Sequence, residues 1–367
     1  MKIVTVIGAR PQIIKAAALS RAIRQHFSKE VQEVIVHTGQ HYDNNMSQVF
    51  FDELDIPQPQ YNIGVGSDSH GAQTAKMIEG IEKILLKEKP DCIVLYGDTN
   101  STLAGAIAAS KIHVPIVHIE AGLRSFNKAM PEEINRICCD HCSTLLFSPT
   151  ATGYKNLLNE GIKTGIYHCG DVMYDNSKYF ANIADKKSQI LDKEELRGID
   201  YVLCTIHRDN NTDQPERLNA IFRALLKISE SKKVILPLHP RTSKSLNVSL
   251  EKTLLHQITN NPNIKILPPA SFFDMIVLER HAQMIITDSG GVQKEAFFFQ
   301  KPCLILRSET EWTEIVECGA AVITDADESI IVESFNNFIE NPPHNDPEIF
   351  GDGNAAAFIC KEMLENF

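Results

Sequence analysis

Short apolar runs alternate with longer amphipathic segments along almost the whole chain, and this alternation restricts the fold more than any other feature. Runs such as KIVTVI at 2–7 are mainly apolar and do not alternate with polar residues, which indicates strands buried on both faces of a sheet. The expected strands form two series. The first lies at 2–7, 33–38, 91–96, 114–119, 144–147 and 165–169, and the second comprises DYVLCTI, KVILPL, IKIL, AQMIIT and PCLIL.

Amphipathic segments at 11–26, 71–88 and 99–111 separate these strands and predict helices. Strands joined through helices form parallel sheets, so we expect an α/β protein with doubly wound sheets. A length of 367 residues suits two domains. The joint is expected near 172–198, where KKSQILDKEELRG is polar and belongs to neither series. Ligands of such sheets bind beyond the carboxyl ends of the strands.

The bulk composition excludes several classes of partner. A net charge of -11 argues against nucleic-acid or membrane-surface binding, which needs a basic patch. No apolar run approaches the roughly 18 residues of a membrane span, and the N-terminus does not have the pattern of a signal peptide. Nine cysteines scattered through apolar segments indicate a reduced, cytoplasmic protein.

One cysteine-containing spacing, Cys139-Asp140-His141-Cys142, resembles part of a metal site. A structural zinc site needs a second ligand pair at a matching distance, and none is evident in the sequence. We therefore expect no bound metal. The absence of GxGxxG and GxxxxGK[ST] also argues against a nicotinamide cofactor and a P-loop.

Charged residues follow the first-series strands. Arg10 and Lys15 come after the first strand, in GARPQIIK, where two cations suit a phosphate or lie simply at the surface. Asp98 follows strand 91–96 in GDTNST and is at least as well explained as a helix N-cap or a turn aspartate. The run HIEAGLRSFNKAMPEEINR then carries both signs of charge. It is either a solvated loop and helix face, or a site for an anionic substrate with a removable proton.

The second series ends in groups that suit a diphosphate. His207 and Arg208 follow its first strand, although either could be a buried structural hydrogen-bonding residue. Ser289, Gly290 and Gly291 lead directly into a helix, so free N–H groups and the helix dipole can face an anion. Glu295, one turn further on, is placed to accept hydrogen bonds from a ribose diol.

These motifs, in this order, resemble the non-hydrolysing UDP-N-acetylglucosamine 2-epimerases over nearly the whole chain. The stretches that carry the resemblance are GARPQIIK, TGQHYDNNM, YGDTNSTLAG, HIEAGL, MPEEINR, HRDNNTD, TDSGGVQKEA and FGDGNAA. The resemblance implies a GT-B fold, two Rossmann-like domains around a cleft that holds the active site. The last helix would cross back to the first domain, giving a domain of 1–171 plus 346–367 and a UDP-binding domain of 172–345.

The resemblance also implies roles for individual residues. The family's essential acidic positions are matched by Asp98, Glu120 and Glu132. Its substrate- and phosphate-handling positions are matched by Arg10, Lys15, Arg136 and His207. The UDP cradle is matched by Ser289, Gly290, Gly291 and Glu295, and the aromatic residue near uracil by Phe272. Gln40 and His41 match a segment that binds a regulatory UDP-sugar in some members.

The implied reaction inverts C2 by eliminating UDP across C1–C2 to a glycal and adding it back, without a cofactor. Trp312 stands where the UDP-N-acetylglucosamine enzymes carry an arginine, and Asn210 replaces a glutamate of the HRxEN motif. The Trp form resembles the branch that acts on UDP-2,3-diacetamido-2,3-dideoxyglucuronate. The sequence leaves both substrates open, with a slight preference for the uronate, within surface polysaccharide precursor synthesis.

Three other functions share parts of this pattern. A GT-B glycosyltransferase has the same cradle but does not need three carboxylates facing the sugar. A catalytically silent UDP-sugar-binding protein would tolerate the loss of the acidic residues, and a hydrolysing epimerase would release free sugar. The resemblance further implies a homodimer.

Overall fold

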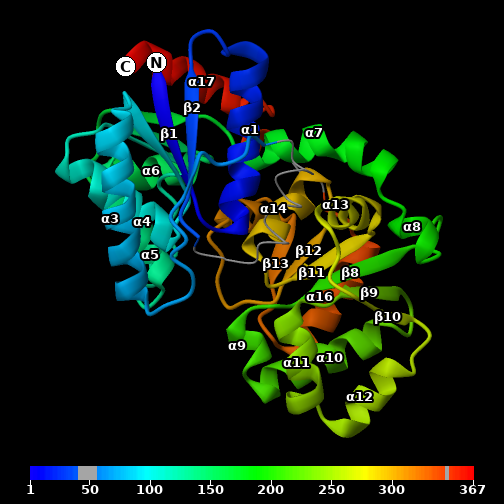
Figure 1. The fold of residues 1–367 in the computed structure, drawn as a ribbon. Helices are drawn as coiled ribbons and strands as arrows, with labels where there is room; N and C mark the ends of the chain where they lie inside the picture. Colours follow the sequence, from blue (N-terminus) through cyan, green and yellow to red (C-terminus); the bar gives the residue numbers. More distant parts are fainter. Residues whose placement is uncertain (40–55, 344–346) are drawn as a thin grey trace. The chain divides into compact units, whose positions relative to one another are not determined.

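The computed structural model describes residues 1–39, 56–343 and 347–367 (Figure 1). The chain divides into two compact units, Met1–Asn176 with Glu348–Phe367, and Ser177–Pro347. Each unit is built on one parallel sheet with helices on both faces. The expected fold class, an α/β protein of the GT-B class with two Rossmann-like domains, is confirmed.

The sheet of the first unit has the strand order β3-β2-β1-β4-β5-β6-β7, and all of its pairs are parallel. Its strands are β1 (Lys2–Ile7), β2 (Gln32–His37), β3 (Tyr61–Asn62), β4 (Cys92–Tyr96), β5 (Ile116–Ile119), β6 (Leu145–Ser148) and β7 (Ile166–His168). Its helices are α1 (Arg10–His26), α3 (His70–Glu88), α4 (Asn100–Lys111), α5 (Pro131–Cys142), α6 (Ala151–Asn159), the first part of α7 (Val172–Lys187), and α17 (Ala355–Asn366). The order reverses between β1 and β4, which is where sheets of this kind bind ligands.

Alternate residues of each strand face opposite layers of helices. Val4 and Val6 of β1 join Met77 of α3 and several alanines of α4 in one buried apolar cluster. On the other face, Thr5 of β1 and Ser20 of α1 both donate hydrogen bonds to the carboxylate of Glu33. Burial raises the pKa of Glu33, while the two hydroxyl groups lower it. The sheet is therefore covered on both sides, as its mainly apolar strands predict.

The sheet of the second unit has the order β10-β9-β8-β11-β12-β13, again with parallel pairs. Its strands are β8 (Tyr201–Thr205), β9 (Lys233–Pro237), β10 (Ile264–Leu267), β11 (Met284–Thr287), β12 (Cys303–Ile305) and β13 (Ala321–Ile323). The helices are α8 (Ile190–Lys193), α9 (Asp209–Thr212), α10 (Pro215–Ile228), α11 (Pro240–Ser249), α12 (Lys252–Thr259), α13 (Phe272–His281), α14 (Gly290–Phe298), α15 (Thr313–Glu317) and α16 (Glu328–Glu340).

The core of the second unit lies mainly between its sheet and the layer of α10, α12 and α16. Val202 of β8 packs there with Phe222 of α10, Ile258 of α12 and Phe335 of α16. The opposite face carries α13, where the Tyr201 hydroxyl donates a 2.7 Å hydrogen bond to the carbonyl of Leu278. β8 and β11 pair in parallel, so the loops that follow them lie at the same edge of the sheet.

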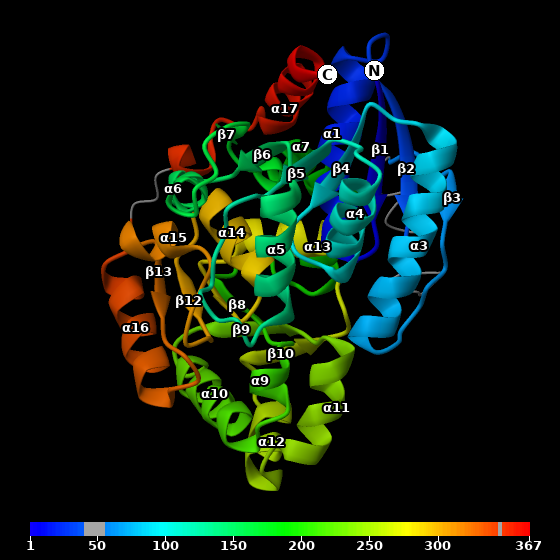
Figure 2. The ribbon, with the colours of Figure 1, turned by 90° about the vertical axis from the view of Figure 1, so that its left-hand side faces the viewer.

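The C-terminal helix α17 belongs to the first unit. It lies beside α1 in both views of the ribbon (Figures 1 and 2). The Asp175 carboxylate of α7 accepts hydrogen bonds from the N–H groups of Ala355 and Ala356, at 3.1 and 2.8 Å. Asp175 thus satisfies two of the free donors at the start of α17.

Eleven strands expected from the sequence are present, and their parallel arrangement is confirmed. β3 and β13, edge strands of two and three residues, are not among the strands expected from the sequence. Such strands are too short to show a run or an alternation. Within the described ranges, no helix is long and apolar enough to span a membrane.

Candidate active site

The loops after β1 and β4 are tied together by one side chain, that of Gln12. Its carbonyl oxygen accepts from the N–H groups of Gly8 and Ala9, and its amide donates 3.0 Å hydrogen bonds to the Tyr96 carbonyl and the Thr102 hydroxyl. Gly8 has no room for a side chain, because a Cβ would lie about 2 Å from two hydroxyl oxygens. The GARPQ motif therefore fixes the edge of the sheet where the polar residues gather.

Asp98 lies in the turn between β4 and α4, and it does not cap that helix. The N-cap is Thr99, whose hydroxyl accepts from the Thr102 N–H. The Asp98 carboxylate forms an ion pair with Arg136, and its backbone carbonyl accepts from the amide of Asn135 at 2.9 Å. The explanation of Asp98 as an N-cap is thus wrong, whereas its position agrees with the other alternative, a turn aspartate.

Glu120 follows β5 in a backbone conformation that few residues with side chains adopt, with a φ of 73°. The N–H groups of Glu120 and Ala121 both donate to the carbonyl of Phe147, which holds this turn. The Glu120 carboxylate forms an ion pair with Lys15, and both side chains are largely buried. Strained backbone of this kind clusters at functional sites.

Gly97 lies between the two acidic residues. A Cβ on Gly97 would be 3.1 Å from both the Glu120 carboxylate and the Lys15 ammonium, so the ion pair lies directly against its Cα. Asp98 is the next residue along the chain. The structure therefore brings Lys15, Glu120, Asp98 and Arg136 to one place in the first unit.

The MPEEINR segment contributes two glutamates with different surroundings. Glu133 is buried and accepts hydrogen bonds from the N–H groups of Ser125 and Phe126, and from Arg136 at 2.9 Å. Glu132 lies in the first turn of α5 and is half-buried. Glu133 thus supports the loop and Arg136.

Arg10 begins α1 and is exposed. It lies at the carboxyl end of β1, one turn of helix before Lys15. Its expected role at a substrate phosphate stays a prediction.

In the second unit, the buried Asp288 organises the loop after β8. Its carboxylate accepts from the N–H groups of His207 and Arg208, at 3.0 and 3.1 Å, and from the Asn211 amide at 3.1 Å. The His207 Nδ1 atom also lies 3.3 Å from this carboxylate, and the His207 ring is about one-third exposed. The Arg208 Nε atom is buried without a hydrogen-bond partner among the described residues.

Ser289 caps α14, as the sequence pattern predicts. Its hydroxyl accepts from the N–H of Val292, and Gly290 and Gly291 form the first turn of the helix. A Cβ on Gly290 would make ordinary contacts of 3.8 Å with the Glu311 carboxylate and the Trp312 indole nitrogen, so these side chains lie beside this N-terminus. Glu295 lies further along α14 and is half-buried.

Phe272, expected near a uracil ring, begins α13 and is 5% exposed. Its ring packs edge-on against Phe180 with centroids 5.3 Å apart, and against Phe273 at 5.7 Å. Packing in the core of the second unit accounts for most of its surface. Contact with a base would use the remaining edge.

Trp312 lies under the start of α14 and is 4% exposed. Its indole nitrogen would be 3.8 Å from a Cβ on Gly290, and the Lys294 ammonium lies 4.1 Å from the centre of its ring. Lys294 is itself 2% exposed, which makes this a desolvated cation–π contact. Trp312, which stands where the resemblance leads us to expect an arginine, thus packs against the Ser289–Gly291 turn.

The Cys139-Asp140-His141-Cys142 stretch forms the end of α5. Asp140 binds the buried His118, and the His141 ring lies 3.3 Å from Glu160. Over residues 1–39, 56–343 and 347–367, no group of three or more His, Cys, Asp or Glu side chains is arranged to hold a metal. Gln40 and His41 lie outside the described residues.

Comparison with known proteins decides the family. The model of a family described as UDP-N-acetylglucosamine 2-epimerase matches residues 22–364. The chain belongs to the UDP-N-acetylglucosamine 2-epimerase family. It is therefore a UDP-sugar 2-epimerase, an isomerase, as its motifs predict.

Three similar proteins cover the whole of this 2-epimerase. A UDP-N-acetylglucosamine 2-epimerase homolog of Methanococcus maripaludis is 49% identical, with 100% of each chain covered. The UDP-2,3-diacetamido-2,3-dideoxy-D-glucuronate 2-epimerase of Pseudomonas aeruginosa is 45% identical, also with 100% of each covered. A crystal structure of the Methanocaldococcus jannaschii UDP-GlcNAc 2-epimerase, in complex with UDP-GlcNAc and UDP, is 40% identical with a TM-score of 0.89 and covers 100% of each chain.

Several residues that organise the site of this 2-epimerase escaped the sequence analysis. Gln12, Glu133 and Asp288 each bind backbone groups of a neighbouring loop. Gln12 follows Pro11 in the quoted GARPQ motif and Asp288 precedes Ser289, so both lay within recognised motifs. For Gln12 and Asp288, the signal in the sequence is a polar residue close to a glycine-containing turn.

Proposed function

We propose that this epimerase inverts C2 of UDP-2,3-diacetamido-2,3-dideoxy-D-glucuronate by eliminating UDP and adding it back. The observation that carries the reaction is the pair of carboxylates, Asp98 and Glu120, held on either side of Gly97 with a cation on each. Such a pair can accept and return a proton without a redox group.

The chemistry follows from the weak acidity of the C2 hydrogen. In the forward step the C1–O bond breaks and its electron pair leaves with the UDP oxygen, while the C2 proton passes to a carboxylate and a C1=C2 bond forms. In the return step the UDP oxygen attacks C1, and C2 receives a proton on its other face. Two faces require two proton-handling groups, for which we propose Glu120 and Asp98, with Glu132 as the third acidic group.

The cations beside these carboxylates suit this use. Lys15 stabilises the carboxylate form of Glu120, which is the form that accepts a proton. Arg136 does the same for Asp98 and is itself oriented by Glu133. Arg10, at the end of β1, is proposed to contact the substrate phosphates.

The departing UDP needs stabilisation of its negative charge. The first turn of α14 offers N–H groups and the positive end of the helix dipole. His207 and Arg208 come to the same edge of the sheet through Asp288. We propose that these groups bind the diphosphate, that Glu295 binds the ribose, and that Phe272 lies near uracil.

The uronate is favoured over UDP-N-acetylglucosamine by the surroundings of Trp312. An indole with Lys294 across its ring replaces an arginine beneath the phosphate-binding turn. The Pseudomonas aeruginosa relative acts on the diacetamido-uronate and covers this chain completely. UDP-N-acetylglucosamine is the second candidate, because the Methanocaldococcus jannaschii enzyme binds it.

Three further features belong to this proposal. The enzyme acts in the cytoplasm, which agrees with its free cysteines. It forms a homodimer, and it supplies precursors of a surface polysaccharide. A regulatory UDP-sugar at Gln40 and His41 remains a prediction.

Turnover in heavy water tests both the reaction and the substrate. Elimination and re-addition exchange the C2 hydrogen with solvent, so the correct sugar gains deuterium at C2 and nowhere else. Each of the two UDP-sugars is incubated separately and followed by NMR and mass spectrometry. Faster exchange of UDP-N-acetylglucosamine would reverse the substrate assignment, and epimerisation without exchange would exclude the elimination.

A further inference from the structure

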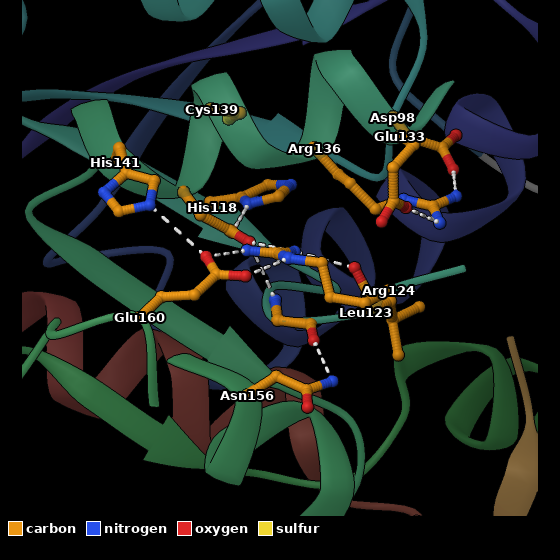
Figure 3. Close-up of polar contacts among 12 residues, drawn as sticks. Asp98, His118, Leu123, Arg124, Glu133, Arg136, Cys139, His141, Asn156 and Glu160 are labelled. Atoms are coloured by element: carbon orange, nitrogen blue, oxygen red, sulfur yellow. Dashed lines mark hydrogen bonds and ion pairs between the residues drawn. The ribbon is translucent and has the colours of Figure 1, made fainter. Parts of the chain in front are cut away.

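A buried network of charged side chains lies in the first unit next to the acidic site residues (Figure 3). It contains His118 at the end of β5, Asp140 on α5, Arg124 in the loop after β5, and Glu160 after α6. His118 and Asp140 are fully buried, and the Arg124 side chain is 1% exposed. None of these residues was assigned a function from the sequence motifs.

Both nitrogens of the His118 ring face hydrogen-bond acceptors. Nδ1 lies 2.7 Å from the Asp140 carboxylate, and Nε2 lies 2.8 Å from the carbonyl oxygen of Gly97. A carboxylate and a carbonyl cannot donate, so both ring nitrogens carry protons and the ring is an imidazolium. Burial acts to lower the pKa of His118, but interactions with Cys139 and Asp140 outweigh burial and raise it well above its ordinary value.

The charges within the network balance. Asp140 pairs with His118 through one oxygen and with Arg124 at 2.7 Å through the other. Burial acts to raise the pKa of Asp140, but these two cations outweigh it and lower the pKa. Arg124 also forms two 2.7 Å hydrogen bonds with Glu160, whose pKa it lowers. Buried charges that are fully paired hold one geometry, since breaking a pair leaves an uncompensated charge.

Gly97 is the residue that connects this network to Asp98 and Glu120. Its N–H donates a 3.0 Å hydrogen bond to the carbonyl of Ile119, and its carbonyl accepts from His118. Both polar groups of Gly97 are therefore bound to β5, the strand that carries Glu120. Gly97 has a φ of 60°, and Asp98 follows it directly.

We infer that His118 is a positioning residue for the reaction: through its Nε2–H donor to the Gly97 carbonyl it sets Asp98 relative to the Lys15–Glu120 pair. Asp140 fixes the ring and, by accepting from the Gly122 N–H at 3.1 Å, also fixes the loop after Glu120. This inference rests on the proposed function, in which Asp98 and Glu120 handle the proton. His118 itself is fully buried and touches no substrate.

Two substitutions separate the link to Gly97 from the loss of the imidazolium charge. In His118→Gln the amide nitrogen occupies the place of Nε2 and can still donate to the Gly97 carbonyl. In His118→Asn the shorter amide reaches only the place of Nδ1, so the donor to Gly97 is lost. Both variants remove the positive charge opposite Asp140. An effect common to both therefore reflects the loss of that charge, and a difference in activity between them reflects the hydrogen bond to the Gly97 carbonyl.

We expect His118→Asn to lower kcat about 10–100-fold, because small misplacements of reacting groups cost that much, with KM and UDP affinity within a few fold of wild type. His118→Gln should stay within a few fold in all three. The control is His141→Gln. It removes a half-exposed histidine that lies on α5 beside Asp140 and contacts Glu160, and it should leave kcat, KM and UDP affinity unchanged. Equal losses in the Gln and Asn variants, or no loss in either, would overturn the inference.

The hydrogen bond from His118 to the Gly97 carbonyl can be detected by NMR, without measuring turnover. The sequence contains three Gly-Asp pairs, at 97–98, 170–171 and 351–352. Labelling glycine with carbonyl ¹³C and aspartate with ¹⁵N therefore yields three correlated signals, and Asp98→Asn identifies the one from Gly97. Its ¹³C shift should move upfield in His118→Asn, which loses the hydrogen bond, and stay in place in His118→Gln.

A measurement on the wild-type protein covers the case in which the variants do not fold. With ¹⁵N-labelled histidine, His118 should show protons on both ring nitrogens from pH 6 to 9, whereas an unprotonated Nε2 would overturn the inference. If wild type exchanges the C2 hydrogen of neither sugar while the Gly97 signal responds as expected, the proposed function fails and the His118–Gly97 link stands.

Discussion

The Cα of Gly97 faces the carboxylate of Glu120 so closely that a methyl group on Gly97 would lie 3.1 Å from Glu120 Oε2. The two residues come from neighbouring strands, β4 and β5, which pair in parallel. A glycine at the end of β4 thus allows the acidic group after β5 to approach Asp98. The proximity of the two carboxylates follows from the absence of a side chain.

Gly97→Ala should lower activity more than stability. The new methyl group must push apart Glu120 and Lys15, while the left-handed backbone costs about 1–2 kcal/mol. Gly319→Ala is the matched control, because Gly319 has a φ of 77° and nothing within 4 Å of its Cβ position. Denaturant unfolding should show similar losses for both variants, and turnover only for Gly97→Ala. Equal activities would show that the close approach is not needed.

Glu120→Gln should abolish epimerisation and leave UDP affinity within a few fold. The amide keeps the shape of the side chain but cannot take a proton, and general acid–base catalysis contributes roughly 10²–10⁴-fold. Turnover is measured by NMR and UDP affinity by calorimetry. Glu79→Gln, which alters an exposed glutamate–lysine pair, serves as the control. Surviving activity would transfer the proton-handling role to Asp98 or Glu132.

The two parallel sheets could be predicted from sequence because the information is local. Five of the six residues of KIVTVI are buried and four of them are aliphatic, which is typical of a strand covered on both faces. Ser289 and the glycines after it likewise announce a helix start within three residues. These features can be recognised from a few consecutive residues, without knowing which residues far away in the sequence they contact.

The supporting residues could not be predicted because their partners are far away in sequence. Glu133 and Glu132 are adjacent and chemically equal, yet only the fold shows that Glu133 is occupied by the loop at Ser125 and Phe126. His118 resembles any histidine in an apolar strand until Asp140 and the Gly97 carbonyl are placed beside it. The spacing at 139–142 resembles only part of a metal site, and the sequence gives no sign that its Asp140 binds this histidine.

Glu295→Ala should weaken UDP binding. If Glu295 accepts hydrogen bonds from the ribose diol, the loss is on the order of 1.5–3 kcal/mol for a charged acceptor. That corresponds to roughly 10–150-fold in the dissociation constant. Calorimetric titration with UDP measures the change, and Glu317→Ala, on the exposed side of α15, provides the control. Unchanged affinity would make Glu295 a structural residue of α14.

UDP should bind equally well in excess chelator. The N–H groups of α14, with His207 and Arg208, supply positive potential that a divalent cation supplies in other diphosphate sites. The measurement is titration with UDP before and after dialysis against EDTA, with and without added Mg²⁺. A large drop in affinity after chelation would show that the helix and side chains do not suffice.

The link between α7 and α17 should make stability depend on pH through Asp175. Burial raises the pKa of Asp175 to about 6, although hydrogen bonds from Ala356 and Ala355 act to lower it. The unfolded value is about 3.9, so the folded protein holds the proton more tightly. This contribution is therefore complete below about pH 4 and is lost as the pH rises through 6.

Asp175→Asn should remove that dependence, since an amide keeps the shape but does not titrate. Between pH 5 and pH 8 the wild type should lose roughly 1–1.5 kcal/mol of stability relative to the variant. Urea unfolding at both pH values measures the difference, and Asp192→Asn, at an exposed carboxylate, is the control. A difference between wild type and variant that stays constant with pH would mean that Asp175 is already ionised at pH 5. Its carboxylate would then bind the start of α17 as a permanent charge.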